Sequence, residues 1–432
     1  MRELIELAPP QERAVLVGAP LKRGTDRHHV AEHLEELERL ADTAGAVVVG
    51  TLTQQLDRPD PATYIGRGKV EELKALLAEA QATLVIFDDE LSPAQGKNLE
   101  GELGKRVIDR AELILDIFAV RARSAEARMQ VELAQLEYSL PRLTRMWTHL
   151  EKFRGGIGVR GPGETQLETD RRLVGHRIKL LKERLAEVAK ARHIQRAGRS
   201  GAFRASLVGY TNAGKSSILR GISGSREVFV EDRLFATLDP LTREVDLGEH
   251  QSVLLTDTVG FIRKLPHHLV ASFRATLEEV QEADLLLHVI DASHPSWEEQ
   301  RLVVDDVLAD LGVQHLPMVY VFNKMDRLEP RDAEALRARI ENLAPGSIFT
   351  SAATAVGLEP LRGLLREALQ NRRPEVTLAI PITDGRLLAE AHRVGEQVQS
   401  TPDDTGAVMR VRGRFEAGAL ARLERAGAVR HP

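Results

Sequence analysis

Short apolar runs alternate with helical patterns along the N-terminal part of the chain. Three runs have the length and composition of buried strands, at residues 14–17, 47–49 and 84–87. Between them, residues 30–40 and 70–80 carry apolar side chains three or four positions apart, which is the spacing of a helix with one buried face. Because strands that alternate with helices favour a parallel sheet, we expect an N-terminal α/β domain over residues 1–123.

The pattern changes after residue 123, where strand-like runs give way to long helical spacing. Over residues 124–139 and 166–196, apolar side chains recur every three or four positions. Between these segments lies the sequence GGIGVRGPGE at residues 155–164, whose glycines and proline predict an exposed loop. We expect a coiled-coil-like helical subdomain over residues 124–200.

Strands and helices alternate again in the C-terminal half. Further strands are predicted at residues 203–208, 243–247, 253–256, 285–290, 319–322 and 347–349. They indicate a second α/β domain over residues 201–373, with a mostly parallel sheet. Residues 374–432 predict a small C-terminal α/β domain of two strands and two helices, with its first helix at 385–399. We expect this unit to pack against the preceding domain, because so short a chain buries little apolar surface by itself.

Composition excludes several classes of protein. The 432 residues are 43% hydrophobic and 28% charged, which is ordinary for a globular protein. The chain has no cysteine, which excludes disulfides, thiolate zinc sites and cysteine-bound iron–sulfur clusters. No apolar run has the length of a signal-peptide core or of a membrane span, so we expect a cytoplasmic protein, with a monomer as the working assumption.

Positive charge is concentrated in the helical segment. Residues 142–204 contain 16 Lys or Arg and 6 Asp or Glu, a net charge of +10; the whole chain has −5, which leaves −15 for the remainder. A basic segment on an acidic protein indicates a polyanionic partner. A solvated helix face without a partner is the alternative, and the charge count does not decide between the two.

The strongest chemical signal is a phosphate-binding loop (P-loop) between a predicted strand and a predicted helix. It has the pattern GxxxxGK[ST] and consists of Gly209, Tyr210, Thr211, Asn212, Ala213, Gly214, Lys215 and Ser216, followed by Ser217. Glycines let backbone N–H groups close around phosphates, while Lys215 can reach the β- and γ-phosphates. The Ser216 hydroxyl can bind Mg²⁺.

Two further motifs identify the metal and the base. The first is DTVG, made of Asp257, Thr258, Val259 and Gly260. Because this motif follows a strand, Asp257 would hold Mg²⁺ and the Gly260 N–H would contact the γ-phosphate.

The second motif is NKMD, made of Asn323, Lys324, Met325 and Asp326. The Asp326 carboxylate can accept hydrogen bonds from N1–H and the exocyclic amine of guanine, which adenine does not supply together. Ser351, Ala352 and Ala353 would complete the base pocket, so the motifs predict GTP as the substrate.

A switch threonine that senses the γ-phosphate and Mg²⁺ is expected between the P-loop and DTVG. The preferred candidate is Thr237, because it lies further from the following strand than the competing candidate, Thr242; the spacing does not decide between them. The residues around the preferred candidate are Leu234, Phe235, Ala236, Thr237 and Leu238. The predicted metal ligands are Ser216, Thr237 and Asp257, and the predicted catalytic residues are Lys215, Thr237, Asn212 and Gly260.

The order of these motifs resembles the translation-factor-related class of GTPases over residues 203–373. Within that class the chain resembles the HflX family through five longer motifs, at residues 109–122 (DRAELILDIFAVRA), 130–143 (QVELAQLEYSLPRL), 155–172 (GGIGVRGPGETQLETDRR), 235–240 (FATLDP) and 257–262 (DTVGFI). The resemblance implies a GTPase that binds the large ribosomal subunit and uses GTP to split stalled ribosomes, notably under stress. It also implies that Arg154, Arg160 and the 155–164 loop approach ribosomal RNA near the peptidyl-transferase region, the alternative role of this loop being a hinge between domains.

One position indicates slow hydrolysis without an activator. Small signalling GTPases carry a Gln after DxxG that orients the attacking water, and this chain has Phe261 there. A group from the ribosome or a potassium ion could replace it, and Asn212 matches the GxxNxGKS pattern of potassium-activated GTPases. A hydrogen bond from Asn212 that holds the switch segment in place is an equally open role for this residue.

Three hypotheses for the function follow from the sequence. The chain is a ribosome-splitting GTPase, a GTPase of ribosome assembly or another RNA transaction, or a GTP-sensing adaptor with little turnover.

Overall fold

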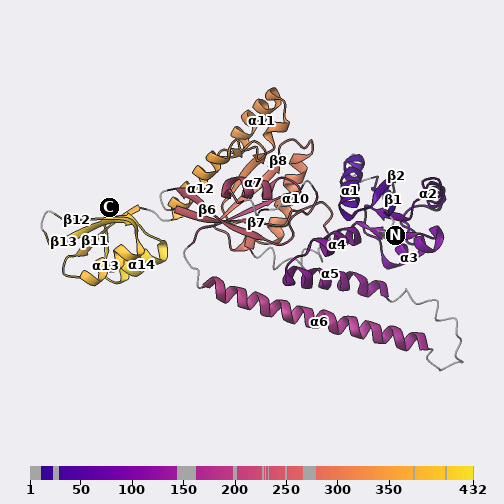
Figure 1. Ribbon diagram of the computed structural model, residues 1–432, viewed down its shortest axis with the longest axis horizontal. Helices are drawn as coiled ribbons and strands as arrows, with labels where there is room; N and C mark the ends of the chain where they lie inside the picture. The colour runs from indigo at the N-terminus through magenta and orange to yellow at the C-terminus, as the bar shows by residue number, and fades with distance from the viewer. Residues whose placement is uncertain are drawn as a thin grey trace, which may run out of the picture.

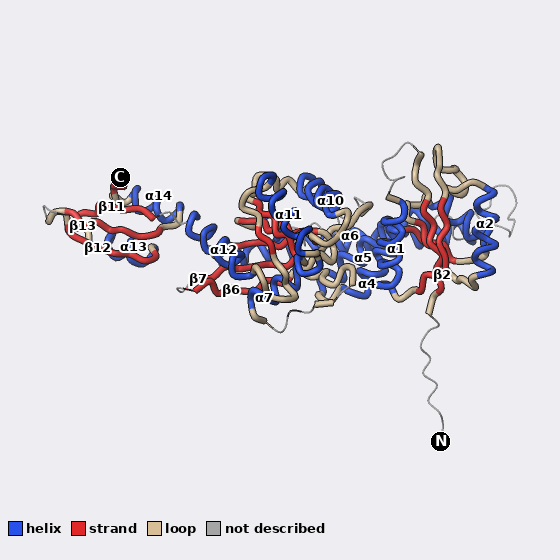
Figure 2. Tube along the Cα trace, turned by 90° about the horizontal axis from the view of Figure 1, so that it is seen from above, coloured by secondary structure: helices blue, strands red, loops and turns tan. Residues whose placement is uncertain are grey.

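Three β-sheets follow one another along the chain, and two long helices lie between the first and the second (Figure 1). The computed structural model describes residues 11–22, 29–143, 162–197, 202–225, 228, 230–231, 233–248, 251–265, 279–372, 375–403 and 406–431. The N-terminal and C-terminal sheets lie at opposite ends of the molecule (Figures 1 and 2). Within the described ranges, no helix combines the length and the apolar composition that a membrane span requires.

The N-terminal sheet is parallel, with strand order β2-β1-β3-β4. Its elements are β1 (Arg13–Gly18), α1 (Val30–Ala44), β2 (Val47–Thr53), α2 (Arg67–Glu79), β3 (Leu84–Phe87), α3 (Pro93–Leu103), β4 (Arg106–Asp109) and α4 (Arg110–Arg121). Leu16 of β1 packs in the same core as α1 and α4, whereas Val17 packs in the core formed with α2 and α3. Helices therefore cover both faces of the sheet, which explains why the sequences of its strands are continuous apolar runs. The strand β4 was not predicted.

The two long helices are α5 (Ala125–Leu143) and α6 (Pro162–Ala197), and they lie side by side (Figure 1). Arg177 of α6 donates two hydrogen bonds, of 2.6 and 2.8 Å, to the Glu132 carboxylate of α5. A second ion pair joins Lys182 to Glu137 at 2.8 Å. Because α6 begins at Pro162, the last three residues of the predicted 155–164 loop are helical; the rest of that loop, with Arg154 and Arg160, lies outside the described residues.

The central sheet has the strand order β10-β9-β8-β5-β7-β6. Its pairs are parallel except for β6 with β7, which is antiparallel. The elements that matter for the site are β5 (Arg204–Gly209), α7 (Lys215–Ser223), β6 (Leu241–Gly248), β7 (Gln251–Asp257), β8 (Leu285–Asp291), α10 (Trp297–Asp310), β9 (Met318–Asn323), η2 (Met325–Arg327), α11 (Pro330–Leu343), β10 (Ile348–Phe349) and α12 (Leu358–Arg372). The structure confirms the predicted mixed α/β class, with a mostly parallel central sheet.

The C-terminal sheet differs from the expectation in two respects. Its elements are β11 (Glu375–Pro381), α13 (Gly385–Val394), β12 (Glu396–Pro402), β13 (Val408–Arg414), α14 (Ala417–Arg425) and β14 (Val429–His431), in the antiparallel order β12-β13-β11-β14. The predicted helix at 385–399 was wrong over its last five residues, because α13 ends at Val394 and β12 follows from Glu396. The unit also has its own buried core around Leu378, Val411 and Phe415, so it does not depend on the preceding domain for burial.

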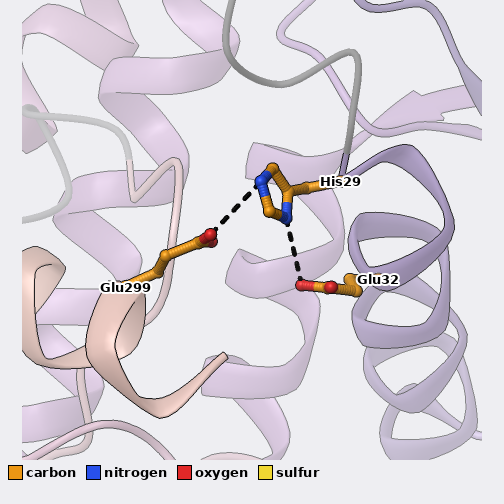
Figure 3. Close-up of side chains that lie close together, drawn as sticks. All are labelled: His29, Glu32 and Glu299. Carbon is orange, nitrogen blue, oxygen red and sulfur yellow. Dashed lines mark ion pairs between the residues drawn. The ribbon is translucent and has the colours of Figure 1, made fainter. Parts of the chain in front are cut away.

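A charged cluster joins α1 to α10, and thus the N-terminal sheet to the central one. His29 Nε2 lies 3.2 Å from Glu299 Oε1, and His29 Nδ1 lies 3.5 Å from Glu32 Oε2 (Figure 3). The Glu299 carboxylate also pairs with Arg263 at 2.9 Å, and the Glu32 carboxylate accepts a hydrogen bond from Ser296. Because both carboxylates already have these partners, we interpret the cluster as a contact between the two units and not as a metal site.

A second, buried network crosses the same interface. Arg110, which is 2% exposed, pairs with Glu36 and with Asp88, the latter at 2.8 Å. From the central unit, the Tyr210 hydroxyl donates to Glu36 and the Lys264 ammonium pairs with Asp88 at 2.6 Å. Burial opposes ionisation of Asp88, but attraction to Arg110 and Lys264 holds its pKa below the usual value. The N-terminal domain is therefore in direct contact with the P-loop, through α1, and with the segment after DTVG, through the residue that follows β3.

Candidate functional site

The P-loop connects the end of β5 to the start of α7. The Lys215 side chain is buried there, and its ammonium donates to the carbonyl oxygens of Gly209 at 3.1 Å and Tyr210 at 3.0 Å. Burial lowers the pKa of Lys215 to about 8, against the attraction of Asp257. An anion beside this ammonium would favour its charged form, which suits a site for phosphate.

Two glycines of the site leave no space for a side chain. A Cβ atom on Gly260 would lie 2.6 Å from Thr211 Cα and 3.0 Å from Lys215 Nζ. Gly214 has a left-handed backbone, with φ of 98°, and a Cβ atom there would lie 2.2 Å from Asn323 Nδ2. The P-loop therefore lies in close contact with both the DTVG and the NKMD segments.

All three predicted metal ligands meet at the start of α7. The Ser216 hydroxyl donates to Asp257 Oδ2 at 2.6 Å and lies 2.8 Å from Thr237 Oγ1. Asp257 is completely buried, and burial raises its pKa. Its Oδ1 atom is buried but accepts no hydrogen bond from any residue that the structure describes. A carboxylate with a free oxygen beside two hydroxyls is a donor set that fits Mg²⁺.

The two candidate switch threonines occupy different places. Thr237 contacts Ser216, as described above. Thr242 lies in β6, where its hydroxyl is 2.8 Å from that of Thr256 in the neighbouring strand β7. Only Thr237 therefore lies beside the residues that fit Mg²⁺.

The NKMD segment is fixed to the P-loop by the side chain of Asn323. Its Nδ2 atom donates to the Ala213 carbonyl at 2.9 Å, and its Oδ1 atom accepts from the Ala352 N–H at 3.1 Å and from Thr350 Oγ1 at 3.2 Å. The Lys324 ammonium pairs with Asp291 at 2.7 Å. Both ends of the Asn323 amide are thus used to position the loops around the base side of the site.

A cavity of about 590 Å³ opens beside these loops. The cavity is lined by Gly214, Ser217, Asn323, Lys324, Asp326, Ala352 and Ala353, among others. Asp326 is exposed at this cavity, and no hydrogen bond or ion pair to it is found among the described residues. Its carboxylate is therefore available to a base.

Some of the predicted nucleotide-binding residues point elsewhere. The side chains of Leu238, Val259 and Met325 are buried among apolar residues, which leaves only their backbone atoms for a ligand. The Tyr210 hydroxyl donates to Glu36 of α1, in the N-terminal domain. These residues support the loops and do not line the cavity beside Asp326.

Phe261 occupies the position at which small signalling GTPases place a water-orienting Gln. Its side chain is 1% exposed and lies in the hydrophobic core. Its backbone pairs with the P-loop, since Thr211 N–H donates to Phe261 O at 2.7 Å and Phe261 N–H donates to Gly209 O at 3.1 Å. The residue holds DTVG against the P-loop, and its side chain cannot orient a water molecule.

The sequence did not reveal how the preferred switch threonine is tethered. Thr211 Oγ1 accepts a hydrogen bond of 2.9 Å from the Phe235 N–H, which ties the P-loop to the switch. On the other side, Asp239 accepts hydrogen bonds from Arg123 and Ser124, at the start of α5. The FATLDP motif contains Phe235 and Asp239, but their partners lie far away in the sequence, so the motif alone does not identify these contacts.

Three protein-family models match the chain in the order of its units. A model described as the N-terminal domain of GTP-binding GTPases matches residues 31–119, and one described as their middle region matches residues 121–199. A third, described as a 50S ribosome-binding GTPase, matches residues 204–324.

Similar proteins cover almost the whole chain. GTPase HflX of Caldanaerobacter subterraneus subsp. tengcongensis is 46% identical over 403 residues, which are 93% of this chain and 91% of that protein. GTPase HflX of Escherichia coli K12 is 44% identical over 399 residues, 92% of each. Among solved structures, a GTP-binding protein of Sulfolobus solfataricus in complex with GDP is 25% identical, with a TM-score of 0.45 over 83% of this chain and 99% of that one. On the identity and coverage of its relatives, the chain belongs to the HflX family of GTPases.

Proposed function

We propose that this GTPase binds the large ribosomal subunit and dissociates stalled or idle ribosomes in a GTP-dependent manner. One observation carries the proposal: a long basic helix is attached to a GTPase unit whose family model is described as 50S ribosome-binding. Over Pro162–Ala197, α6 has 9 Lys or Arg and 5 Asp or Glu. Such a helix is suited to the phosphates of ribosomal RNA, and a ribosomal partner implies a cytoplasmic location.

Turnover measurements separate this proposal from the two alternatives. GTP hydrolysis is measured alone, with purified large subunits and with intact ribosomes, while sedimentation follows whether the ribosomes come apart. Stimulation together with dissociation is the expected result. Stimulation without dissociation would favour a role in assembly or another RNA transaction, and the absence of stimulation would favour a GTP-sensing adaptor.

We assign roles within the nucleotide site from its geometry. Lys215 and the Gly260 N–H bind the terminal phosphates, and Asp326 selects guanine. Ser216, Thr237 and Asp257 would hold Mg²⁺, which when bound neutralises charge on the β- and γ-phosphates. Because the Phe261 side chain is buried, we propose that a partner or an ion supplies the group that completes hydrolysis.

Substitution of Thr237 tests the switch assignment. Thr237→Ala should lower GTP hydrolysis by about 100-fold, because one oxygen beside the proposed Mg²⁺ site is lost. GDP affinity should change by less than about 3-fold, since the threonine senses the γ-phosphate. Thr242→Ala is the matched control and should hydrolyse GTP at the wild-type rate. The rate of GTP hydrolysis is measured by phosphate release. An equal loss of this rate in Thr237→Ala and Thr242→Ala would contradict the assignment of Thr237 as the switch threonine.

Potassium dependence tests the role of Asn212. Its backbone is left-handed, with φ of 60°, and the residue borders the small cavity at Lys215, Ser216 and Thr237. We expect turnover in potassium to exceed turnover in sodium by at least about 10-fold, since a cation there would offset transition-state charge. Asn212→Ala should abolish the difference between GTP turnover in potassium and GTP turnover in sodium. If the variant instead loses the same fraction of activity in both salts, Asn212 braces the switch; equal wild-type turnover in the two salts rules out potassium activation.

A further inference from the structure

We propose that Asp239 couples the nucleotide state of the switch to the position of the α5–α6 helices. The switch segment (residues 233–239) is held from two sides: Thr237 contacts Ser216 in the nucleotide site, whereas Asp239 contacts the start of α5. The inference rests on the proposed assignment of Thr237. It adds a route by which GTP changes the orientation of the helical unit that we propose to bind ribosomal RNA.

Asp239 holds the N-cap residue of α5, Ser124, from a different part of the chain. Its Oδ2 atom accepts hydrogen bonds from the N–H groups of Arg123 at 3.0 Å and Ser124 at 3.2 Å, and its Oδ1 atom accepts from the Ser124 hydroxyl. The Ser124 hydroxyl in turn accepts from the Ala127 N–H at 3.0 Å. A carboxylate is favoured at this end of a helix because the free N–H groups carry partial positive charge. The N-cap residue of α5 is therefore held in place by the switch segment.

Two further contacts bind the same region to α4, the helix before α5. The Phe235 and Phe118 rings pack edge to face, with centroids 4.7 Å apart. Arg121 pairs with Glu231 at 2.5 Å. Both acidic partners of the helices, Glu231 and Asp239, thus flank Thr237 in the sequence. The α4–α5 junction is attached to the switch segment at Phe235 and Asp239, and to Glu231 shortly before it.

A displacement of Thr237 would act on a segment that is also attached to the start of α5. Asp239 is only two residues away, a stretch of at most about 7 Å when fully extended. Because the link is so short, a movement of Thr237 from Ser216 towards a bound γ-phosphate would displace Asp239 or weaken its hydrogen bonds at the start of α5. The coupling is reciprocal, because a partner that favours one position of α5–α6 also favours one position of Thr237. Binding of the helices to a partner would therefore change the rate of hydrolysis.

Distance measurements on the isolated full-length chain test this coupling. The chain has no cysteine, so Ala186→Cys on α6 and Ala335→Cys on α11 give two unique, exposed sites for spin labels. In the otherwise wild-type chain we expect the mean distance between the labels to differ by about 2–5 Å between GDP and a non-hydrolysable GTP analogue with Mg²⁺. Adding Asp239→Ala should abolish this difference while the variant still binds both nucleotides.

Three controls make the result specific. Asp306→Ala removes an exposed carboxylate of α10 and should retain the full shift. Asp239→Asn keeps one acceptor oxygen and should retain part of the nucleotide-dependent change in label distance. Ser124→Ala should also reduce the shift, and it carries the test if Asp239→Ala does not fold. The inference is overturned if the label distance changes fully with nucleotide in Asp239→Ala, or does not change in the otherwise wild-type chain. No ribosome enters the experiment, so its outcome is independent of whether the protein splits ribosomes.

Discussion

Asp326→Asn should lower the affinity for GTP by about 1000-fold while leaving the fold unchanged. The carboxylate accepts two hydrogen bonds from guanine in the proposed complex, and each charge-assisted bond contributes roughly 1.5–3 kcal/mol. Asn offers one acceptor and turns a donor towards the exocyclic amine, so that one bond becomes a repulsion. Asp326 is exposed at the cavity and pairs with nothing in the described part of the chain, so no internal contact is lost.

The same variant should gain affinity for xanthosine triphosphate, in which an oxygen replaces the exocyclic amine. Titration calorimetry with GTP, ATP and xanthosine triphosphate measures the change in specificity. Asp332→Asn on α11 is the matched control, because it removes an exposed carboxylate away from the cavity. Unchanged GTP affinity in Asp326→Asn would show that another residue selects the base.

The second large effect is expected at Lys215. Lys215→Ala should reduce nucleotide affinity by at least about 100-fold and hydrolysis by more, since a buried ammonium is lost from the phosphate site. The nucleotide-free variant should nevertheless unfold no earlier than the wild type. Burial lowers the pKa of Lys215 to about 8, so its charge at neutral pH costs stability in the empty site.

Two measurements check this separation of binding from folding. Fluorescent GDP titration reports affinity, and thermal unfolding without nucleotide reports stability. Lys105→Ala, at an exposed position after α3, should behave as the wild type in both. A variant that binds nucleotide normally, or that binds poorly only because it unfolds, would contradict the role given to Lys215.

Most of the fold could be predicted because its strands are buried on both faces. The apolar runs of β1, β3 and β8 stand out in the sequence for that reason. Two of the missed strands lack this signal: β12 (EQVQSTP) has a single aliphatic residue, Val398, and β14 has three residues, all exposed. The third, β4 (RVID), is largely buried but has only four residues, two of them aliphatic. The helix before β12 was predicted too long because Gly395, which ends α13, is a weak signal inside an otherwise helical stretch.

The nucleotide site could be predicted because its residues are grouped in short motifs at strand ends. The parallel order of β5, β7, β8 and β9 then brings those ends to one edge of the sheet. The choice between Thr237 and Thr242 needed the structure, since both lie between the same two motifs. The contacts of Asp239, Tyr210 and Lys264 also needed it, because each joins segments more than 100 residues apart.

The most direct test of GTP-dependent ribosome dissociation is sedimentation of intact ribosomes through a sucrose gradient after incubation with the protein. With a non-hydrolysable GTP analogue and Mg²⁺, we predict that the ribosome peak is converted to separate subunits and that the protein sediments with the large subunit. GDP, or Lys215→Ala with the analogue, should leave the peak intact. Ribosomes that stay associated in the presence of the wild-type protein and the analogue would contradict the proposed function.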